Sequence, residues 1–446
     1  MWELLRLSAR AKFGALARVA AMLAIGLAAA EGLLAAEAAV PARPLSLAEC
    51  TVIALEHNPQ IGSSEQGVIS ARAGVTRARS SYYPQLSSEV VEGFAGSASS
   101  LFPDGGTDRR DDASVVFGQT LWRRGRKESV AQSEASLRAS EFGRASTVQS
   151  LVELVARNYY ALLAASQLVG VAEAGVASAE GHLEQVKARI KLGDAAAVEV
   201  YPAEDDLARA RLDLIDARSD VRLAQARLKN TMGVPPTTEV QLAESPPGEE
   251  GQTPALSEAV AAALARRPEV LASQASTSAA GSALKLARIN RGPIADVSGQ
   301  YAWDYTEWRL RERTWDVLLN FAFPIFDGYA RKADVIAAEA GLGLAQADYQ
   351  QTVNQVGLEV EDALVEVERA RERVVASAAS VAAAEARLAA AEGKYRQGIG
   401  ILIEVIDARV AVTQARASQV SARYDYQTSL VGVQRALGTL AVPEMR

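Results

Sequence analysis

The pattern of apolar and polar positions changes its period along the chain, and it does so twice in the same order. From residue 296 alternate residues share an apolar face, and a second alternating stretch follows a polar loop. A period of two predicts β-strands whose faces meet different environments. We therefore expect a long-looped β-hairpin over about 294–324. A weaker copy is expected over about 86–122, with strands at 86–94 and 114–122.

A long helix with one apolar seam follows each hairpin. In the second copy, large residues recur every seven positions with small residues between them, and the first copy repeats this about 205 residues earlier. A heptad repeat sustained this long indicates a coiled-coil seam. Each helix ends at a glycine turn, and another long helix returns. The sequence thus predicts antiparallel helical hairpins over about 127–232 and 331–437. The large seam residues are Val360, Val367, Val374, Val381, Leu388 and Tyr395.

The whole order of predicted elements occurs twice along the chain. Asn58-Pro59 matches Arg267-Pro268, and Met232-Gly233 matches Leu437-Gly438. A period near 200 residues is too long for a solenoid, so we expect two fused copies of one supersecondary unit. The predicted fold is mainly α with a small β part. The domain boundaries are a first repeat over 39–240, a Pro/Gly linker over 241–255 and a second repeat over 256–440.

Residues 1–38 have the pattern of a signal peptide. A basic segment precedes a short apolar run over 19–30, and Ala36-Glu37-Ala38 offers a cleavage site. The alternative is a membrane anchor, although the run is shorter than the ~20 residues that a spanning helix needs. We expect no other stretch to be apolar enough to span a bilayer as a helix. Any membrane span of an exported protein would then consist of strands.

Composition and charge exclude several classes of function. The net charge of −7 leaves no basic footprint for nucleic acid, and one cysteine cannot build a disulfide framework. The two histidines, His57 and His182, have no metal-ligand spacing and belong to no readable nucleophile arrangement. We therefore expect no enzyme, no cofactor and no metal site.

The tryptophans after Trp2 cluster in or beside the two predicted β-hairpins. They form either an interfacial aromatic girdle around a lipid-facing band or the ordinary core of a small sheet. Four strands are too few to close a membrane barrel, and open sheet edges do not survive in hydrocarbon. If the strands meet lipid, several chains must share one barrel. Two chains would supply eight strands and little or no lumen, whereas three would supply twelve strands and a water-filled passage. These girdle candidates are Trp122, Trp303, Trp308 and Trp315.

This duplicated order of elements resembles the TolC-like outer-membrane efflux channels, over about residues 45–440. The resemblance implies a homotrimer with a 12-stranded transmembrane β-barrel in the outer membrane and a long periplasmic α-barrel. It also implies two partners, a periplasmic adaptor protein and an inner-membrane pump. The matching motifs are His57-Asn58-Pro59, Phe326-Asp327-Gly328, Tyr395-x-x-Gly398, Glu404-Val405-Ile406-Asp407-Ala408 and Arg435-Ala436-Leu437-Gly438.

The resemblance also assigns candidate residues to the hairpin tips. Glu404 and Asp407 fall where the family has pore-facing acids, and Glu199 is the first-copy counterpart of Glu404. The alternative is that all three are ordinary solvated acids of helix turns. Tyr395 falls where a family tyrosine ties the tip helices together, or it is simply the last seam residue. Gly400 stands where many members carry a latch arginine, so a charge-based latch is in doubt.

The tips also carry apolar residues at their turns, which is unusual for a solvated surface. We expect these residues to form a docking surface for the adaptor. Three functions stay open from the sequence: an exit duct for small molecules, the duct of a type I protein secretion system, and a soluble periplasmic coiled-coil scaffold. The docking candidates are Leu192, Gly193, Gly398, Ile399 and Ile401.

Overall fold

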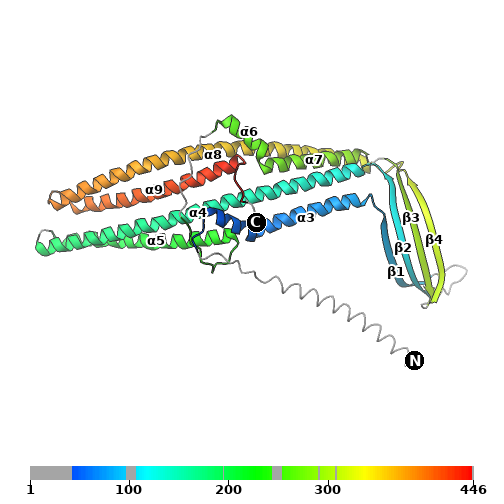
Figure 1. Ribbon diagram of the computed structural model, residues 1–446, viewed down its shortest axis with the longest axis horizontal. Helices are drawn as coiled ribbons and strands as arrows, with labels where there is room; N and C mark the ends of the chain where they lie inside the picture. The colour runs from blue at the N-terminus through cyan, green and yellow to red at the C-terminus, as the bar shows by residue number, and fades with distance from the viewer. Residues whose placement is uncertain are drawn as a thin grey trace, which may run out of the picture.

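The computed structural model places four strands at one end of a long helical body (Figure 1). The predicted signal peptide, Trp308 and most of the predicted linker lie outside the described residues. The fold is mainly helical, and its duplicated order of elements confirms the predicted fold class. The described residues are 43–96, 107–193, 195–243, 254–289, 292–306 and 309–443.

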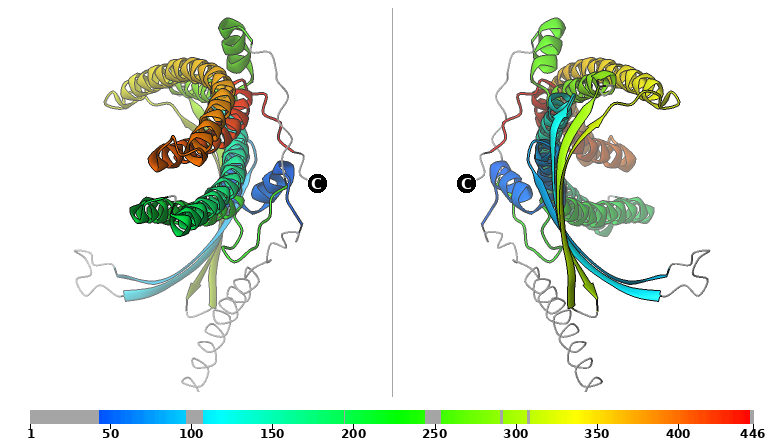
Figure 2. Two further views of the ribbon diagram at one scale, coloured as in Figure 1. Left: turned by 90° about the vertical axis from the view of Figure 1, so that its left-hand side faces the viewer. Right: turned by 90° about the vertical axis from the view of Figure 1, so that its right-hand side faces the viewer.

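Two helices of 67 residues, α4 (Arg126–Leu192) and α8 (Ala330–Arg396), run the length of the helical body. At 1.5 Å per residue each extends about 100 Å. Shorter helices pack along them end to end: α3 and α5 lie along the two halves of α4, while α7 and α9 lie along α8 and also contact α4. The result is one curved layer of helices (Figure 2). Their bounds are α3 (Pro59–Ser80), α5 (Val200–Met232), α7 (Pro268–Ile289) and α9 (Leu402–Ala436).

Each repeat opens with a short helix that packs against the middle of its long helix. These are α2 (Leu47–His57) and α6 (Leu256–Arg266). Ser46 caps α2 in a capping box with Glu49, which satisfies free N–H groups at the helix start. Because Pro59 disfavours helical backbone at the residue before it, α2 ends there, and Asn58 caps α3 instead.

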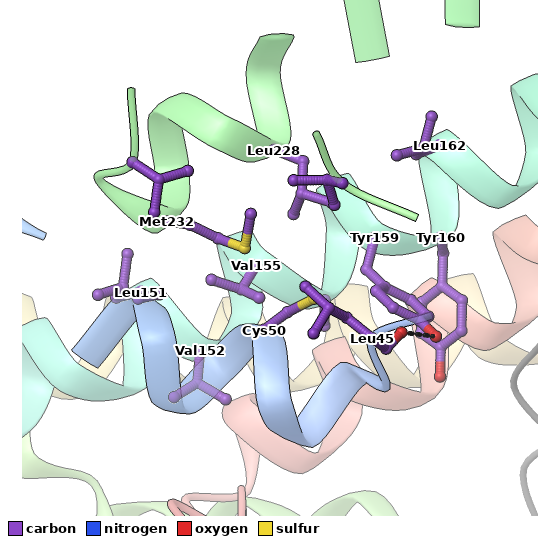
Figure 3. Packing of buried hydrophobic residues seen from close by; sticks show 14 of the residues in the cluster. Leu45, Cys50, Leu151, Val152, Val155, Tyr159, Tyr160, Leu162, Leu228 and Met232 are labelled. Atoms are coloured by element: carbon purple, nitrogen blue, oxygen red, sulfur yellow. Dashed lines mark hydrogen bonds between the residues drawn. The ribbon is translucent and has the colours of Figure 1, made fainter. Parts of the chain in front are cut away.

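Two apolar clusters hold these helices, one in each repeat. In the first, Cys50 of α2 is buried against Val155 of α4 and Met232 of α5 (Figure 3). The hydroxyl of Tyr159 donates to the carbonyl of Ala243 at 2.6 Å, so a buried polar atom is satisfied where the linker begins. In the second cluster, Ala259 takes the place of Cys50 beside α8.

The strands form one antiparallel sheet in the order β1-β2-β3-β4. The second hairpin agrees with the predicted bounds, but β2 begins seven residues before the expected Ser114 and pairs with β1 from Thr107 to Gly118. Its first residues are polar and charged, so hydrophobic alternation did not mark them. The bounds are β1 (Gln85–Gly96), β2 (Thr107–Arg123), β3 (Ile294–Thr306) and β4 (Arg309–Ala322).

The register sorts the side chains of the sheet onto an apolar face and a mostly polar face. A bulge between Thr120 and Trp122 shifts the pairing, so Trp122 rather than Leu121 joins the apolar face beside Ala295. Within the part of the chain that the structure describes, no helix lies over either face (Figures 1 and 2). The apolar face comprises Leu86, Val90, Val115, Phe117, Trp122, Val297, Tyr301, Trp303, Trp315, Val317, Leu319 and Phe321.

Two helices, α4 and α8, are long and apolar enough to cross a membrane by length and composition, with 18-residue windows of mean hydropathy 1.4. The expectation that no such stretch exists outside the N-terminus is therefore wrong. The physical reason is the alanine- and valine-rich seam, which raises hydropathy as a membrane helix does. Each helix is roughly three times longer than the ~30 Å hydrocarbon core.

Candidate functional site at the hairpin tips

The tips of the two helical hairpins lie side by side at the end of the molecule farthest from the sheet (Figure 1). Gly193 ends α4 with φ +82°, and Gly398 follows α8 with φ +74°. Left-handed backbone at a helix end favours glycine because a Cβ atom is strained there. The predicted glycine turns are therefore where the chain reverses.

Tyr395 links the two hairpins. Its side chain is buried, and its hydroxyl donates to Oε2 of Glu199 on the first hairpin at 2.9 Å. The guanidinium of Arg189 lies 4.4 Å from the centre of the tyrosine ring, and its Nη1 donates to the Tyr395 carbonyl at 3.1 Å. Burial, followed by the bond to Glu199, raises the pKa of Tyr395, so the phenol stays protonated as the donor. The structure thus brings together two of the four predicted gate residues.

The other two, Glu404 and Asp407, lie apart from this pair in the first turns of α9. Both side chains are exposed. Residues three apart share a helix face, so the two carboxylates project from the same side of α9. Among the described residues, no group of His, Cys, Asp and Glu is arranged to hold a metal ion.

Gly400 has little room for a side chain. A Cβ atom there would lie 2.9 Å from Cβ of Lys394 and 3.0 Å from the backbone nitrogen of Tyr395. The Gly400 N–H also donates to the Lys394 carbonyl at 3.1 Å, which holds the turn against the end of α8. An arginine at this position would therefore force the turn backbone to move.

The docking candidates lie exposed to solvent at the turns. Leu192, Ile399 and Ile401 are 76%, 74% and 60% exposed. At Gly193 and Gly398 an added Cβ atom would meet nothing within 4 Å. The turns therefore offer apolar surface without steric cover.

One set of tip residues was missed in the sequence. Arg409 of α9, Asp206 of α5 and His182 of α4 are all buried, at 7%, 9% and 5% exposure. Arg409 donates from Nη2 to Oγ of Ser178 on α4. The available signal was the spacing of Arg409, which falls between buried apolar residues at positions 405 and 412.

The sheet carries the predicted girdle residues at two levels. Trp122 pairs with Ala295 near the helical body, whereas Trp303 lies farther along β3, and Trp315 is paired with Tyr301. From Ala295 to Trp303 the strand rises about 26 Å at 3.3 Å per residue. Lipid-facing bands of outer-membrane barrels are about 25 Å tall. The described tryptophans therefore lie at two levels of the sheet, and their role as an interfacial girdle stays a prediction.

A family model described as outer membrane efflux protein matches residues 51–234 and 259–439, one segment in each repeat. The fold is similar to the Campylobacter jejuni CmeC outer membrane channel, with a TM-score of 0.78 and 19% identity over 89% of this chain and 87% of that one. It is also similar to the open state of the Neisseria gonorrhoeae MtrE outer membrane channel, with a TM-score of 0.75 and 19% identity over 90% of each chain.

Two relatives with higher sequence identity support the same family. Protein CyaE of Bordetella pertussis is 27% identical over 328 residues, which cover 72% of this chain and 68% of the relative. Outer membrane protein TolC of Vibrio cholerae is 27% identical over 191 residues, only 42% of either chain. The chain thus belongs to the outer membrane efflux protein family, and it is an outer-membrane protein whose long helices extend into the periplasm.

Proposed function

We propose that three copies of this chain form a passive duct, through which small molecules leave the cell after an inner-membrane pump and a periplasmic adaptor deliver them. The sheet carries this proposal. Its edge strands, β1 and β4, each have one edge unpaired in the described part of the chain, and its apolar face is uncovered. Neighbouring copies would pair these edges and close a barrel, with the polar face lining the passage. No catalytic chemistry is assigned to this passage.

Two adjacent residues of β4 test the assignment of faces. Val317 lies on the apolar face, paired with Gly299 midway between Ala295 and Trp303, and Leu318 lies on the other face; they are 66% and 52% exposed. Arginine on a lipid-facing position costs about 2–4 kcal/mol near the bilayer centre, whereas lumen positions tolerate charge. We expect Val317→Arg to abolish detergent-extractable, unboiled trimers from the outer membrane. The matched variant Leu318→Arg should assemble and change only the ion selectivity of the pore.

The oligomer itself is tested on unboiled gels of the mature protein, extracted with and without detergent. The duct requires a detergent-dependent trimer that conducts ions in a planar bilayer. A water-soluble monomer would instead support the coiled-coil scaffold and would overturn the duct.

At the periplasmic end, we propose that Glu404 and Asp407 face the pore. Threefold symmetry would repeat each carboxylate three times, and rings of like charge favour cations and repel one another. The Tyr395–Glu199 bond would hold the entrance narrow by tying the two hairpins of each chain together. Glu404→Gln with Asp407→Asn should reduce the preference for cations over anions in bilayer recordings, without loss of trimer.

The exposed apolar turns at the tips are proposed to dock the adaptor. Ile401→Glu should abolish efflux in cells that depend on this protein, at an unchanged trimer yield, because a charge on the contact surface must be desolvated. Ile401→Leu keeps the surface apolar and should leave efflux intact. Unchanged efflux in Ile401→Glu would remove the docking role.

A further inference from the structure

The hairpin tips contain a polar contact between residues to which the family resemblance assigns no role. Arg409 of α9 reaches across to the first hairpin and donates to Ser178 of α4. It also attracts the carboxylates of Asp206 on α5 and Glu392 on α8. One arginine therefore interacts with all three of the other tip helices.

Arg409 is buried although its side chain carries a charge. It is 7% exposed, and it lines a groove of about 370 Å³ between the two hairpins together with Ser178 and Asp206. Burial lowers the pKa of Arg409, while Asp206 and Glu392 oppose this change. A buried charge is stable only while its partners stay in place. The position of α9 against α4 and α5 is therefore coupled to this group.

We infer that Arg409 is a clasp, which holds the second hairpin against the first when the entrance is closed and supplies the charge-based contact that Gly400 does not. The inference rests on the proposed duct. Because the desolvation of a buried charge offsets much of the attraction, such a clasp holds two hairpins together without locking them permanently. A fully apolar contact in its place would lack this offset, because apolar groups gain no favourable hydration when the hairpins separate.

The clasp differs from the Tyr395–Glu199 link in position and in chemistry. Tyr395 acts at the last turn of α8, with a neutral donor and one acceptor. Arg409 lies farther from the turn, nearly two helical turns beyond the start of α9 at Leu402. Each chain would thus be closed at two levels, and breaking either one should loosen the entrance without unfolding the hairpins.

The test is bilayer conductance of the assembled wild-type trimer and its variants. Hydrogen bonds to charged groups contribute enough that Arg409→Ala should raise the ratio of open to closed entrances about ten- to hundredfold. Ser178→Ala, which removes only the acceptor, should give a smaller increase, and Arg409→Lys should restore part of the closure. The double variant should open little more than Arg409→Ala alone, because both changes break one contact.

Arg416 provides the matched control. It lies on the same helix and lines the same groove, but its ion pair with Glu385 at 2.7 Å stays within the second hairpin. Arg416→Ala should therefore leave the entrance closed. If Arg409→Ala does not assemble, Ser178→Ala and Arg409→Lys make the same comparison.

The outcomes separate the clasp from the duct. A conducting wild-type trimer whose opening is unchanged by Arg409→Ala or by Ser178→Ala overturns the clasp alone. An equal increase in Arg416→Ala also overturns it, because general loosening of the groove would then explain the effect. A wild-type protein that never conducts overturns the duct and the clasp together.

Discussion

At the junction of its first two helices, the first repeat uses neutral hydrogen bonds where the second uses buried ion pairs. Asn58 donates from Nδ2 to the carbonyl of Thr231 at 2.8 Å. Its counterpart Arg267 places Nη1 2.6 Å from Oε2 of Glu359, with its side chain only 3% exposed. The helices and the proline that follow are the same in both copies.

The ion pairs of the second repeat extend beyond that repeat. Glu269 accepts from Arg435 of α9 at 3.3 Å and from the hydroxyl of Ser146 on α4 at 3.0 Å, and Arg435 also pairs with Glu153 of α4. This network therefore joins the second repeat to the first. Duplicated backbone thus accommodates neutral hydrogen bonds in one repeat and ion pairs in the other at matching positions.

Among matched substitutions in the two repeats, the largest difference in lost stability is expected at their final glycines. Gly233 has φ +72°, and a Cβ atom there would lie 2.5 Å from the carbonyl oxygen of His57; at Gly438, with φ +68°, the nearest atom is 3.1 Å away. Gly233→Ala should therefore destabilise the protein by about 3–4 kcal/mol, against about 1–2 for Gly438→Ala, because only the first adds a backbone clash to the strain. Thermal unfolding of the detergent-solubilised trimer measures both, and equal losses would contradict the difference in packing.

Removal of the buried cation is the next largest effect. Arg267→Met leaves Glu359 without its partner and removes one of the two arginines beside Glu269. It should cost about 2–3 kcal/mol, less than for a fully buried pair because both carboxylates are partly exposed. The double variant Arg267→Met/Glu359→Leu should recover part of the loss. Asn58→Ala in the first repeat, which removes a helix cap, should cost about 1 kcal/mol. Chemical denaturation of the three variants compares them, and an Asn58→Ala loss as large as that of Arg267→Met would contradict the ordering.

We expect His182 to make the tip of the first hairpin sensitive to acid. Burial, followed by the nearby Arg409, lowers its pKa from 6.5 to about 4. A separated tip would bind a proton that the packed tip does not, so stability of the packed tip falls as the pH drops from about 6.5 towards 4. The loss should be about 1–2 kcal/mol at pH 5.

The acid effect is measured as entrance opening against pH in bilayers. Burial raises the pKa of Asp206, which favours the packed tip as the pH falls and so opposes His182. His182→Gln removes the titrating imidazole and should abolish the opening between pH 6.5 and 5. Arg387, the exposed counterpart in the second repeat, provides the control Arg387→Gln, which should keep it. Opening that persists in His182→Gln would assign the acid effect elsewhere.

The smallest effect is expected at Cys50, where the second repeat already has Ala259. Both positions are buried, and Cys50→Ala removes one sulfur from the first core, at a cost of about 1 kcal/mol or less. Burial raises the pKa of the thiol to about 12, so the folded protein should not react with iodoacetamide at neutral pH. Rapid labelling of the native trimer would show that this core opens.

Much of the architecture was predictable because its signals are local and periodic. The heptad seam predicted α4 and α8, alternation predicted the second hairpin, and Gly193 and Gly398 marked the turns. The start of β2 was not predictable from alternation, because its first residues pair with β1 without an apolar face to reveal them. The bulge before Trp122 was hidden for a related reason, since only pairing with β3 shows that one residue is extra.

The candidate site was predictable in part. The family resemblance placed Tyr395, Glu404 and Asp407 at a tip, but it paired none of them with a residue of the first hairpin. Arg409 and Ser178 are 231 positions apart in the sequence. Neither residue is unusual in its own helix, so no local pattern connects them.

The sequence by itself determined the elements and their duplication, since hydrophobic period, prolines and glycines act on neighbouring residues along one helix or strand. Only the tertiary structure decided which polar groups meet across the two hairpins and which tryptophan joins the apolar face of the sheet. These depend on distances between segments roughly 200 residues apart, where a shift of one helical turn changes every partner.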